Sequence, residues 1–198
     1  YVLAPRDKVD SFVAEAQGAV KKMFPTIKDN PDYTAIVAQR HYDRIMGYVE
    51  DARAKGARII EIKPDDEDLT QQEHRKIAPT LIIDPSDDLK VMQEEIFGPV
   101  LPIKTYDRIE ETIDYVNAHD RPLGLYYFGE DAGEQRQVLD RTISGGVTLN
   151  DVIFHISNEE LPFGGIGPSG MGAYHGFDGF KTFSHGKSVY KQPKINIA

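Results

Sequence analysis

The sequence predicts an α/β fold with a mostly parallel sheet and flanking helices. Short apolar runs alternate with segments whose apolar residues recur at the helical period of 3.6 residues. Hydrophobic residues make up 40% of the 198-residue chain, which suffices for a real core at this length. Ten of the 17 glycines lie between residues 145 and 186, so we expect irregular loops and close backbone contacts there.

The first half of the chain is expected to hold two helices and two strands, after an N-terminus that itself reads as part of a strand. Apolar residues at Val9, Val13 and Val20 indicate the first helix, and Gly56 is a stop signal for the second. The charged stretch after the first strand has the composition of a solvated loop. In order, these elements are a helix over residues 7–24, a helix over 35–55, a strand over 58–62, a loop over 63–76 and a strand over 80–83.

The second half repeats the alternation and adds two signals for helix starts. Asp107 with Glu110, and Asp131 with Glu134, have the spacing of a capping box in which Asp replaces Ser or Thr. Each pair precedes apolar residues at helical spacing. The expected strands cover residues 100–103, 123–128 and 146–149, and the two helices lie between them.

Composition and charge exclude several classes of protein. The net charge of −9, from 23 basic and 32 acidic side chains, argues against nucleic acid or an anionic membrane as the main partner. The absence of cysteine excludes disulfides, thiolate zinc sites, iron–sulfur clusters and a cysteine nucleophile within the chain. No two of the six histidines stand three or four residues apart, so we expect no helical metal site. No apolar run approaches the roughly 20 residues that span a bilayer.

Residues 94–99, Glu-Glu-Ile-Phe-Gly-Pro, form the first candidate site. The Gly-Pro pair predicts a turn or loop before the strand at residue 100. A carboxylate there can accept hydrogen bonds from the vicinal hydroxyls of a sugar, and the aromatic ring can pack against a flat ring. The alternative is a solvated turn with a core phenylalanine, and residue chemistry alone favours it, because most acidic side chains simply lie at the surface.

Residues 161–172 form the second candidate site and contain a literal G-x-G-x-x-G at Gly165, Gly167 and Gly170. A dinucleotide-binding loop needs this motif between a strand and an amphipathic helix. Here Pro162 and Pro168 flank or interrupt it and no helical stripe follows, so we favour a rigid loop in which backbone segments touch. A G-x-S-x-G elbow is missing as well, and no complete catalytic set is visible.

These two motifs, in this order and about 60 residues apart, resemble the NAD(P)-dependent aldehyde dehydrogenase superfamily. Residues 121–126 and 145–151 look like later strands of the family. Residues 174–185 are similar to the branch that contains fatty- and aromatic-aldehyde enzymes, and within it to bacterial coniferyl-aldehyde dehydrogenases. The resemblance covers essentially the whole chain.

The resemblance implies an enzyme that oxidises aldehydes, here of an aromatic, coniferyl type, to carboxylic acids with NAD or NADP. In that family a cysteine thiolate attacks the carbonyl, hydride passes to the nicotinamide, and a glutamate-activated water hydrolyses the thioester. The nucleophilic Cys, the general-base Glu and most of the cofactor domain are expected upstream of Tyr1. We therefore expect no catalytic residue in this chain, and neither activity nor more than weak cofactor binding from the chain alone.

The same resemblance assigns accessory roles to five residues. Glu95 should hold the nicotinamide ribose hydroxyls and Phe97 should pack near the nicotinamide. His41 and Arg44 match positions that can touch the cofactor ribose. Phe163 should line the site where nicotinamide and substrate meet.

Three further polar residues are expected to be structural. The resemblance makes Asn150 and Ser169 structural hydrogen-bonding residues. His155 lies among apolar neighbours in the sequence, and a buried, hydrogen-bonded histidine is the default for such a pattern.

The resemblance also implies that the chain has two parts with different roles. Residues 1–176 would be the C-terminal part of a catalytic domain, and residues 177–198 a tail that carries an oligomerisation strand at about residues 182–191. We expect a homo-oligomer in the cytoplasm, with an aldehyde substrate and a nicotinamide cofactor as partners, and without nucleic acid or a membrane span. The alternative is a non-catalytic assembly module built on the same fold.

Overall fold

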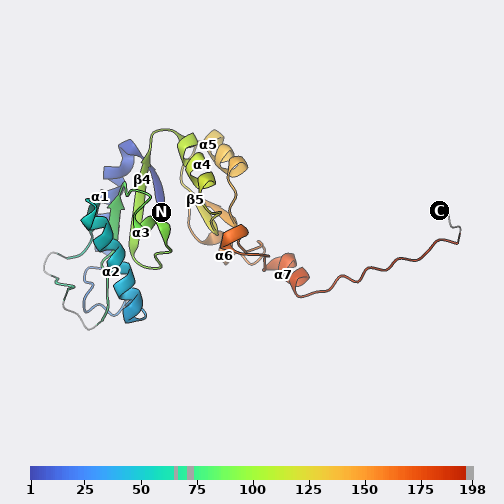
Figure 1. Cartoon of the computed structure of the whole chain (residues 1–198), viewed down its shortest axis with the longest axis horizontal. Coiled ribbons are helices and arrows are strands. Elements are labelled where there is room, and N and C mark those ends of the chain that lie inside the picture. Colours follow the sequence, from blue (N-terminus) through green and yellow to red (C-terminus); the bar gives the residue numbers. More distant parts are fainter. Residues whose placement is uncertain (65–66, 71–73, 195–198) are drawn as a thin grey trace. The chain divides into compact units, whose positions relative to one another are not determined.

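The computed structural model of the chain describes residues 1–64, 67–70 and 74–194 (Figure 1). It divides into two compact units, Tyr1–Arg108 and Ile109–Ala198, and each is described by itself. The predicted division after residue 176 concerns catalysis and assembly, and it stays a prediction.

The first unit is built on a four-stranded sheet in the order β1-β4-β3-β2. The strands are β1 (Val2–Pro5), β4 (Val100–Tyr106), β3 (Thr80–Ile83) and β2 (Arg58–Glu61). The pairs β1–β4 and β3–β4 are parallel, whereas β2 joins β3 antiparallel at the edge. The prediction of a mostly parallel sheet is therefore confirmed.

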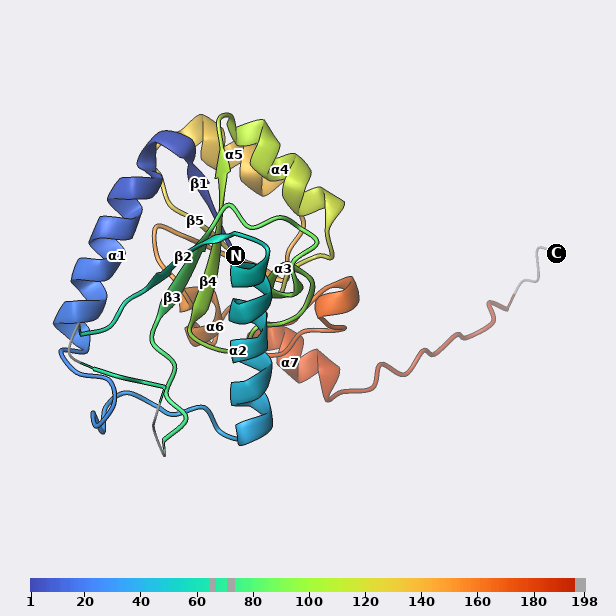
Figure 2. The ribbon, with the colours of Figure 1, turned by 60° about the vertical axis from the view of Figure 1, so that its left-hand side comes forward.

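Helices α1 (Val9–Met23) and α2 (Gln39–Ala54) cover opposite faces of this sheet (Figure 2). Successive side chains of a strand point to opposite faces, and β3 shows this plainly. Leu81 and Ile83 pack with α1, whereas Ile82 packs with α2. A 3-10 turn, η1 (Arg6–Lys8), leads into α1, and the short helix α3 (Lys90–Gln93) packs beside α2. All four residues of β3 are buried, as its apolar sequence predicts.

The second helix begins at Gln39, four residues later than predicted. The backbone before it is held in other contacts. The Ile36 N–H donates to the Arg75 carbonyl at 3.0 Å, and the Arg75 side chain returns a bond to the Ile36 carbonyl at 3.1 Å. Ala38 is extended, with φ −147°. These long-range contacts, which local periodicity does not reveal, delay the helix.

The charged segment 63–76 is not simply solvated, and that prediction is wrong for two of its residues. Glu67 is half-buried, and its carboxylate accepts the backbone N–H groups of Ile27 and Lys28 at 2.9–3.1 Å. Lys76 is buried and donates to the Ile27 and Asn30 carbonyls. Both charged groups satisfy backbone atoms of the loop before α2. Residues 65–66 and 71–73 lie outside the described residues.

The second unit contains a parallel pair of strands, β5 (Gly124–Tyr127) and β6 (Gly146–Leu149). Helices α4 (Ile109–Ala118) and α5 (Ala132–Arg141) belong to the same unit, and Ile113, Tyr127 and Val138 form a small core between helices and strand. The predicted cap of α5 is confirmed, because the Asp131 carboxylate accepts the Glu134 N–H at 2.8 Å.

The C-terminal part of the second unit is irregular, as its glycine content predicts. Helices α6 (Phe154–Ser157) and α7 (Gly176–Thr182) and the 3-10 turn η2 (Gly167–Ser169) are all short. The predicted strand at 182–191 is not formed in this single chain. Thr182 ends α7, and residues 183–194 extend from it without strand pairing to the described residues (Figure 1). A strand that joins another subunit finds no partner within one chain, so its pairing stays a prediction.

Candidate functional site

The loop between α3 and β4 presents two of the predicted site residues. It covers residues 94–99 and contains no helix or strand, as the Gly-Pro pair predicts. Glu95 is exposed, and Phe97 exposes 82% of its surface. The alternative of a core phenylalanine is therefore excluded for Phe97. An acid and an aromatic ring stand accessible together in one short loop.

The backbone of this loop is held by Arg44 of α2. Its Nη1 donates to the Glu95 carbonyl at 2.7 Å, and its Nη2 donates to the Ile96 carbonyl at 2.8 Å. The planar guanidinium thereby binds two successive peptide units. The structure shows Arg44 as a ligand of the loop. Its predicted contact with a cofactor ribose stays a prediction.

Tyr48 links this arginine to the side chain of Glu94. The Tyr48 hydroxyl accepts a hydrogen bond from Arg44 Nη1 at 2.8 Å and donates to Glu94 Oε2 at 2.7 Å. Tyr48 is 3% exposed, so its hydroxyl is carried on a ring fixed in the core. A hydroxyl between a guanidinium and a carboxylate makes charge-assisted bonds in both directions.

Two apolar contacts complete the attachment of the loop. Ile96 packs against the core cluster that contains Ile45 and Tyr48. A β-carbon on Gly98 would lie 2.5 Å from Ile45 Cδ1, so glycine allows the loop to approach α2 closely. Phe97 between them has φ 47°, in the left-handed region that phenylalanine rarely adopts. The loop is thus anchored on both sides of two outward-facing side chains.

His41 lies one helical turn before Arg44. It is half-buried in the first turn of α2, and a spacing of three residues places the two on neighbouring parts of one helix face. The structure therefore brings four of the predicted residues, His41, Arg44, Glu95 and Phe97, into one unit. Their joint contact with a cofactor stays a prediction.

Sequence reasoning missed Tyr48, and it included Glu94 in the candidate segment without assigning it a partner. Tyr48 stands four residues after Arg44, a spacing at which helix side chains meet. That spacing was the available signal. The contact with Glu94 joins residues 46 positions apart, and no local pattern reports it.

Phe163 belongs to the second unit and is half-buried in an aromatic cluster. Its backbone exchanges two hydrogen bonds with Tyr174, at 2.8 and 2.9 Å. Its ring centroid lies 5.5 Å from Tyr174, 6.2 Å from His175 and 6.4 Å from His155. The ring is therefore fixed in place, while its predicted position beside substrate and nicotinamide stays a prediction.

The glycine-rich segment is a tight loop, as predicted, and its structure gives no support to a phosphate cradle. A β-carbon on Gly164 would lie 2.0 Å from the Gly172 carbonyl oxygen, and one on Gly165 would lie 2.1 Å from that of Ser169. The motif itself contains the three-residue turn η2, and the next helix, α7, begins only at Gly176, so the motif does not open the long helix of a dinucleotide loop. Ser169 Oγ accepts the Ile166 N–H and donates to the Ile166 carbonyl, which is the structural role expected of it.

His155 is 6% exposed and covers one face of the β5–β6 pair. Its Nδ1 lies 2.7 Å from Thr148 Oγ1, and its ring lies within 3.4 Å of the β-carbon positions of Gly124 and Gly146. Its Nε2 has no hydrogen-bond partner among the described residues. The prediction of a buried histidine with a structural hydrogen bond is confirmed at Nδ1, whereas the expectation that the ring is fully satisfied is not met at Nε2. Asn150 is structural too, because its side chain binds both the N–H and the carbonyl of Gly129.

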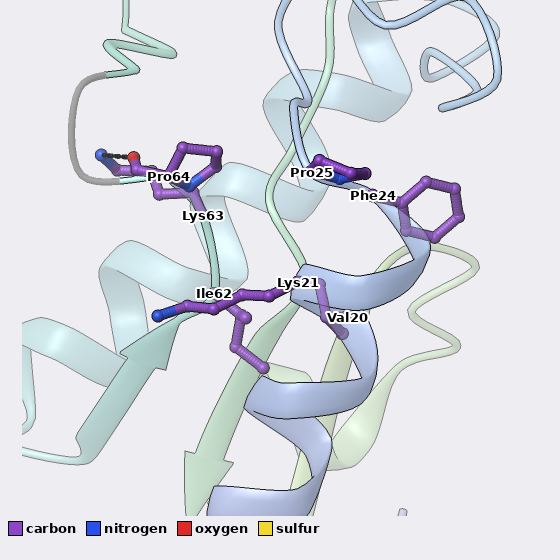
Figure 3. A pocket seen from close by; sticks show the side chains of 7 residues that line it. All are labelled: Val20, Lys21, Phe24, Pro25, Ile62, Lys63 and Pro64. Carbon is purple, nitrogen blue, oxygen red and sulfur yellow. Dashed lines mark hydrogen bonds between the residues drawn. The ribbon is translucent and has the colours of Figure 1, made fainter.

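A hollow of about 300 Å³ lies elsewhere in the first unit, where α1 ends and β2 is followed by a loop (Figure 3). Lys63 on its wall donates to backbone carbonyls of Pro64 and Glu67. Its lining residues are Val20, Lys21, Phe24, Pro25, Ile62, Lys63 and Pro64. None of the predicted site residues is among them.

Two general features of the described chain bear on function. No group of three or more His, Cys, Asp or Glu side chains within residues 1–64, 67–70 and 74–194 is arranged to hold a metal ion. No helix in this part of the chain has the length and apolar character needed to cross a membrane.

The chain belongs to the aldehyde dehydrogenase family, whose family model matches residues 1–189. The chain is 71% identical over its whole length to a probable coniferyl aldehyde dehydrogenase of Caulobacter vibrioides, and it spans 41% of that protein. It is 56% identical over 98% of its length to a coniferyl aldehyde dehydrogenase of Pseudomonas sp., of which it covers 40%. The predicted resemblance is confirmed.

The fold is also similar to a solved structure of this family. It matches the substrate-bound AldH of Staphylococcus aureus with a TM-score of 0.84 and 35% identity, over 100% of this chain and 42% of that one. The chain thus spans about two fifths of the length of the proteins it matches.

Proposed function

We propose that this chain forms part of an NAD(P)-dependent aldehyde dehydrogenase that oxidises aromatic aldehydes of the coniferyl type to carboxylic acids. Its contribution is a surface for the nicotinamide half of the cofactor. The family membership and the names of its relatives support the reaction class. The observation that carries the cofactor surface is the anchored loop with Glu95 and Phe97 exposed together.

The chemistry of the two exposed side chains fits the nicotinamide riboside. An ionised carboxylate accepts two hydrogen bonds, which matches the two adjacent hydroxyls of a ribose. The Phe97 ring offers a flat apolar face to a heteroaromatic ring. Bound NAD(P)+ would supply the hydride acceptor, and this loop would orient it. Because the loop backbone is fixed before binding, little ordering entropy opposes that orientation.

The nucleophile and the general base of the proposed reaction would come from a part of the full-length protein outside these 198 residues. The chain itself contains no cysteine. Phe163, fixed in its aromatic cluster, would line the substrate site. A homo-oligomer in the cytoplasm is part of the same proposal, with residues 182–191 as an assembly strand.

The test is cofactor affinity in the full-length protein that contains this chain. Glu95→Gln keeps the shape of the side chain and removes one acceptor and the charge. A hydrogen bond to a charged group contributes roughly 1.5–3 kcal/mol, so we expect the NAD+ Kd to rise by about tenfold or more. Calorimetric titration measures it. Glu15→Gln, on the exposed side of α1, is the matched control.

An unchanged Kd for Glu95→Gln would remove the loop from the cofactor site. Coniferaldehyde turnover by the 198-residue chain alone would contradict the proposal that the nucleophile lies outside it. A full-length protein that neither binds NAD(P)+ nor oxidises aldehydes would favour the non-catalytic assembly module.

A further inference from the structure

We propose that Arg44 is a positioning residue that fixes the conformation of the loop 94–98 from which Glu95 and Phe97 project. This inference rests on the proposed function for the meaning of the loop, and it goes beyond it in assigning what holds the loop. The family resemblance places Arg44 at a position that can touch the cofactor ribose. The structure directs two bonds of its guanidinium to the loop backbone.

Arg44 holds two neighbouring carbonyl groups of the loop at the same time. Arg44 binds the Glu95 and Ile96 carbonyls with two different nitrogens, at 2.7 and 2.8 Å. The guanidinium is planar and rigid, so two peptide units bound to it cannot rotate independently. The two bound peptide units flank Ile96: one follows Glu95 and the other precedes Phe97. Each of the two exposed side chains therefore leaves the backbone beside a peptide unit that Arg44 holds, and Arg44 constrains the direction of both.

Arg44 is itself held in its orientation by Tyr48. Its Nη1 also donates to the hydroxyl of Tyr48, which is 3% exposed and bonds Glu94 at 2.7 Å. Its guanidinium carbon lies 5.2 Å from the centroid of the Tyr48 ring. Partners of this kind lock the rotamer of a functional residue and hold a site to within a fraction of an ångström. Hydrogen bonds thus run from the Glu95 carbonyl through Arg44 and Tyr48 to the Glu94 carboxylate, so the network begins and ends at the loop.

The hydrogen bonds of Arg44 to the loop also maintain a strained backbone at Phe97. Phe97 adopts φ 47°, and a non-glycine residue in that region persists only where its surroundings impose it. The bonds to the residue pair before Phe97 and the close contact of Gly98 with Ile45 are the constraints on either side of it. Without Arg44 the first constraint is lost, and the loop can relax toward ordinary backbone angles.

The experiment compares Arg44→Met, Arg44→Lys and Tyr48→Phe with the control Arg40→Met, in the full-length protein. Arg40 lies on the same helix and is exposed. The first readout, called loop exchange, is amide hydrogen exchange without cofactor at Glu94 and Val100, whose N–H groups donate to the Lys90 and Gly98 carbonyls at the two ends of the loop. The second is the NAD+ Kd, together with kcat at saturating cofactor.

We expect Arg44→Met to speed exchange in the loop by about tenfold or more, with exchange in β3 unchanged. The NAD+ Kd should rise by a similar factor while kcat falls less. Arg44→Lys should restore part of both, because an ammonium replaces one carbonyl bond but not the planar pair. Tyr48→Phe keeps the buried ring and should show a smaller effect of the same kind. Arg40→Met should match the parent protein.

Unchanged loop exchange in Arg44→Met would overturn the inference, and a raised Kd with unchanged exchange would make Arg44 a direct cofactor ligand instead. If Arg44→Met does not fold, the Tyr48→Phe exchange decides between the same outcomes. Suppose that loop exchange is faster in Arg44→Met, while the NAD+ Kd is unchanged in both Arg44→Met and Glu95→Gln. That result would confirm that Arg44 anchors the loop and would contradict the proposed cofactor-binding function of the loop.

Discussion

The Thr148 hydroxyl binds His155 twice, at 2.7 Å from the ring Nδ1 and at 3.2 Å from the backbone nitrogen. Both residues are buried. The paired positions of β5 and β6 on this face are Gly124 with Gly146, and Tyr126 with Thr148. The glycines leave space for the imidazole, and the threonine holds it.

Replacement of Thr148 by valine should therefore destabilise the protein. Valine keeps the shape but leaves two buried groups of His155 without their partner, a loss of roughly 1–3 kcal/mol. The measurement is the free energy of unfolding from urea titration. Thr34→Val, at an exposed position, should change it by less than about 0.5 kcal/mol. Equal stability of the two variants would mean that the hydroxyl contributes nothing to holding the ring.

Two glycine-to-alanine substitutions should have opposite signs. In Gly165→Ala the new methyl group would meet the Ser169 carbonyl oxygen at 2.1 Å and the Gly170 nitrogen at 2.6 Å, so we expect a loss of at least about 2 kcal/mol. Gly18 lies inside α1 with open space around its β-carbon position, so Gly18→Ala should stabilise by about 0.5–1 kcal/mol. Thermal unfolding followed by circular dichroism compares them. A tolerated Gly165→Ala would contradict the tight packing of this loop.

Tyr33 should make stability depend on alkaline pH. Burial raises the pKa of Tyr33 from 10 to about 12, and its hydroxyl donates to the Ile77 carbonyl at 2.6 Å. The folded state therefore favours the protonated phenol. Its contribution is complete below pH 10 and is lost as pH rises through 12. Tyr33→Phe should cost roughly 1–3 kcal/mol at pH 8, and this difference from the parent should shrink above pH 10.

Urea unfolding at pH 8, 10 and 11.5 measures that difference. The other tyrosines titrate in both proteins and cancel. Tyr190→Phe, at a side chain 85% exposed, is the control and should show no pH-dependent difference. A difference that stays constant to pH 11.5 would show that the hydroxyl does not ionise differently in the folded state.

The chain should self-associate in solution. Phe177, Phe180 and Phe183 are 68%, 67% and 90% exposed, and the first two rings stack at 6.0 Å. Contiguous exposed apolar surface of this kind favours association. Sedimentation velocity of the 198-residue chain should show oligomers, and Phe180→Ser with Phe183→Ser should reduce them. A monomer at high concentration would contradict this expectation.

Local patterns predicted the elements whose cause is local. The apolar run of β3 and the Asp131 cap of α5 are examples, since each needs only a few adjacent residues. The start of α2 and the half-buried state of Glu67 depend on partners about 40 residues away, and no local pattern contains them. The candidate site divides in the same way. The motif identified Glu95 and Phe97, whereas the attachment by Arg44 and Tyr48 needed three-dimensional contacts.

Because Gly98 lies so close to Ile45, the volume allowed at position 98 depends on the side chain at position 45. A residue larger than glycine at position 98 needs the space that Ile45 Cδ1 occupies. A shorter side chain at position 45 would release that space. We therefore expect a residue larger than glycine at position 98 to be accompanied, within the family, by a shorter side chain at position 45. Natural selection therefore acts jointly on this helix residue and this loop residue.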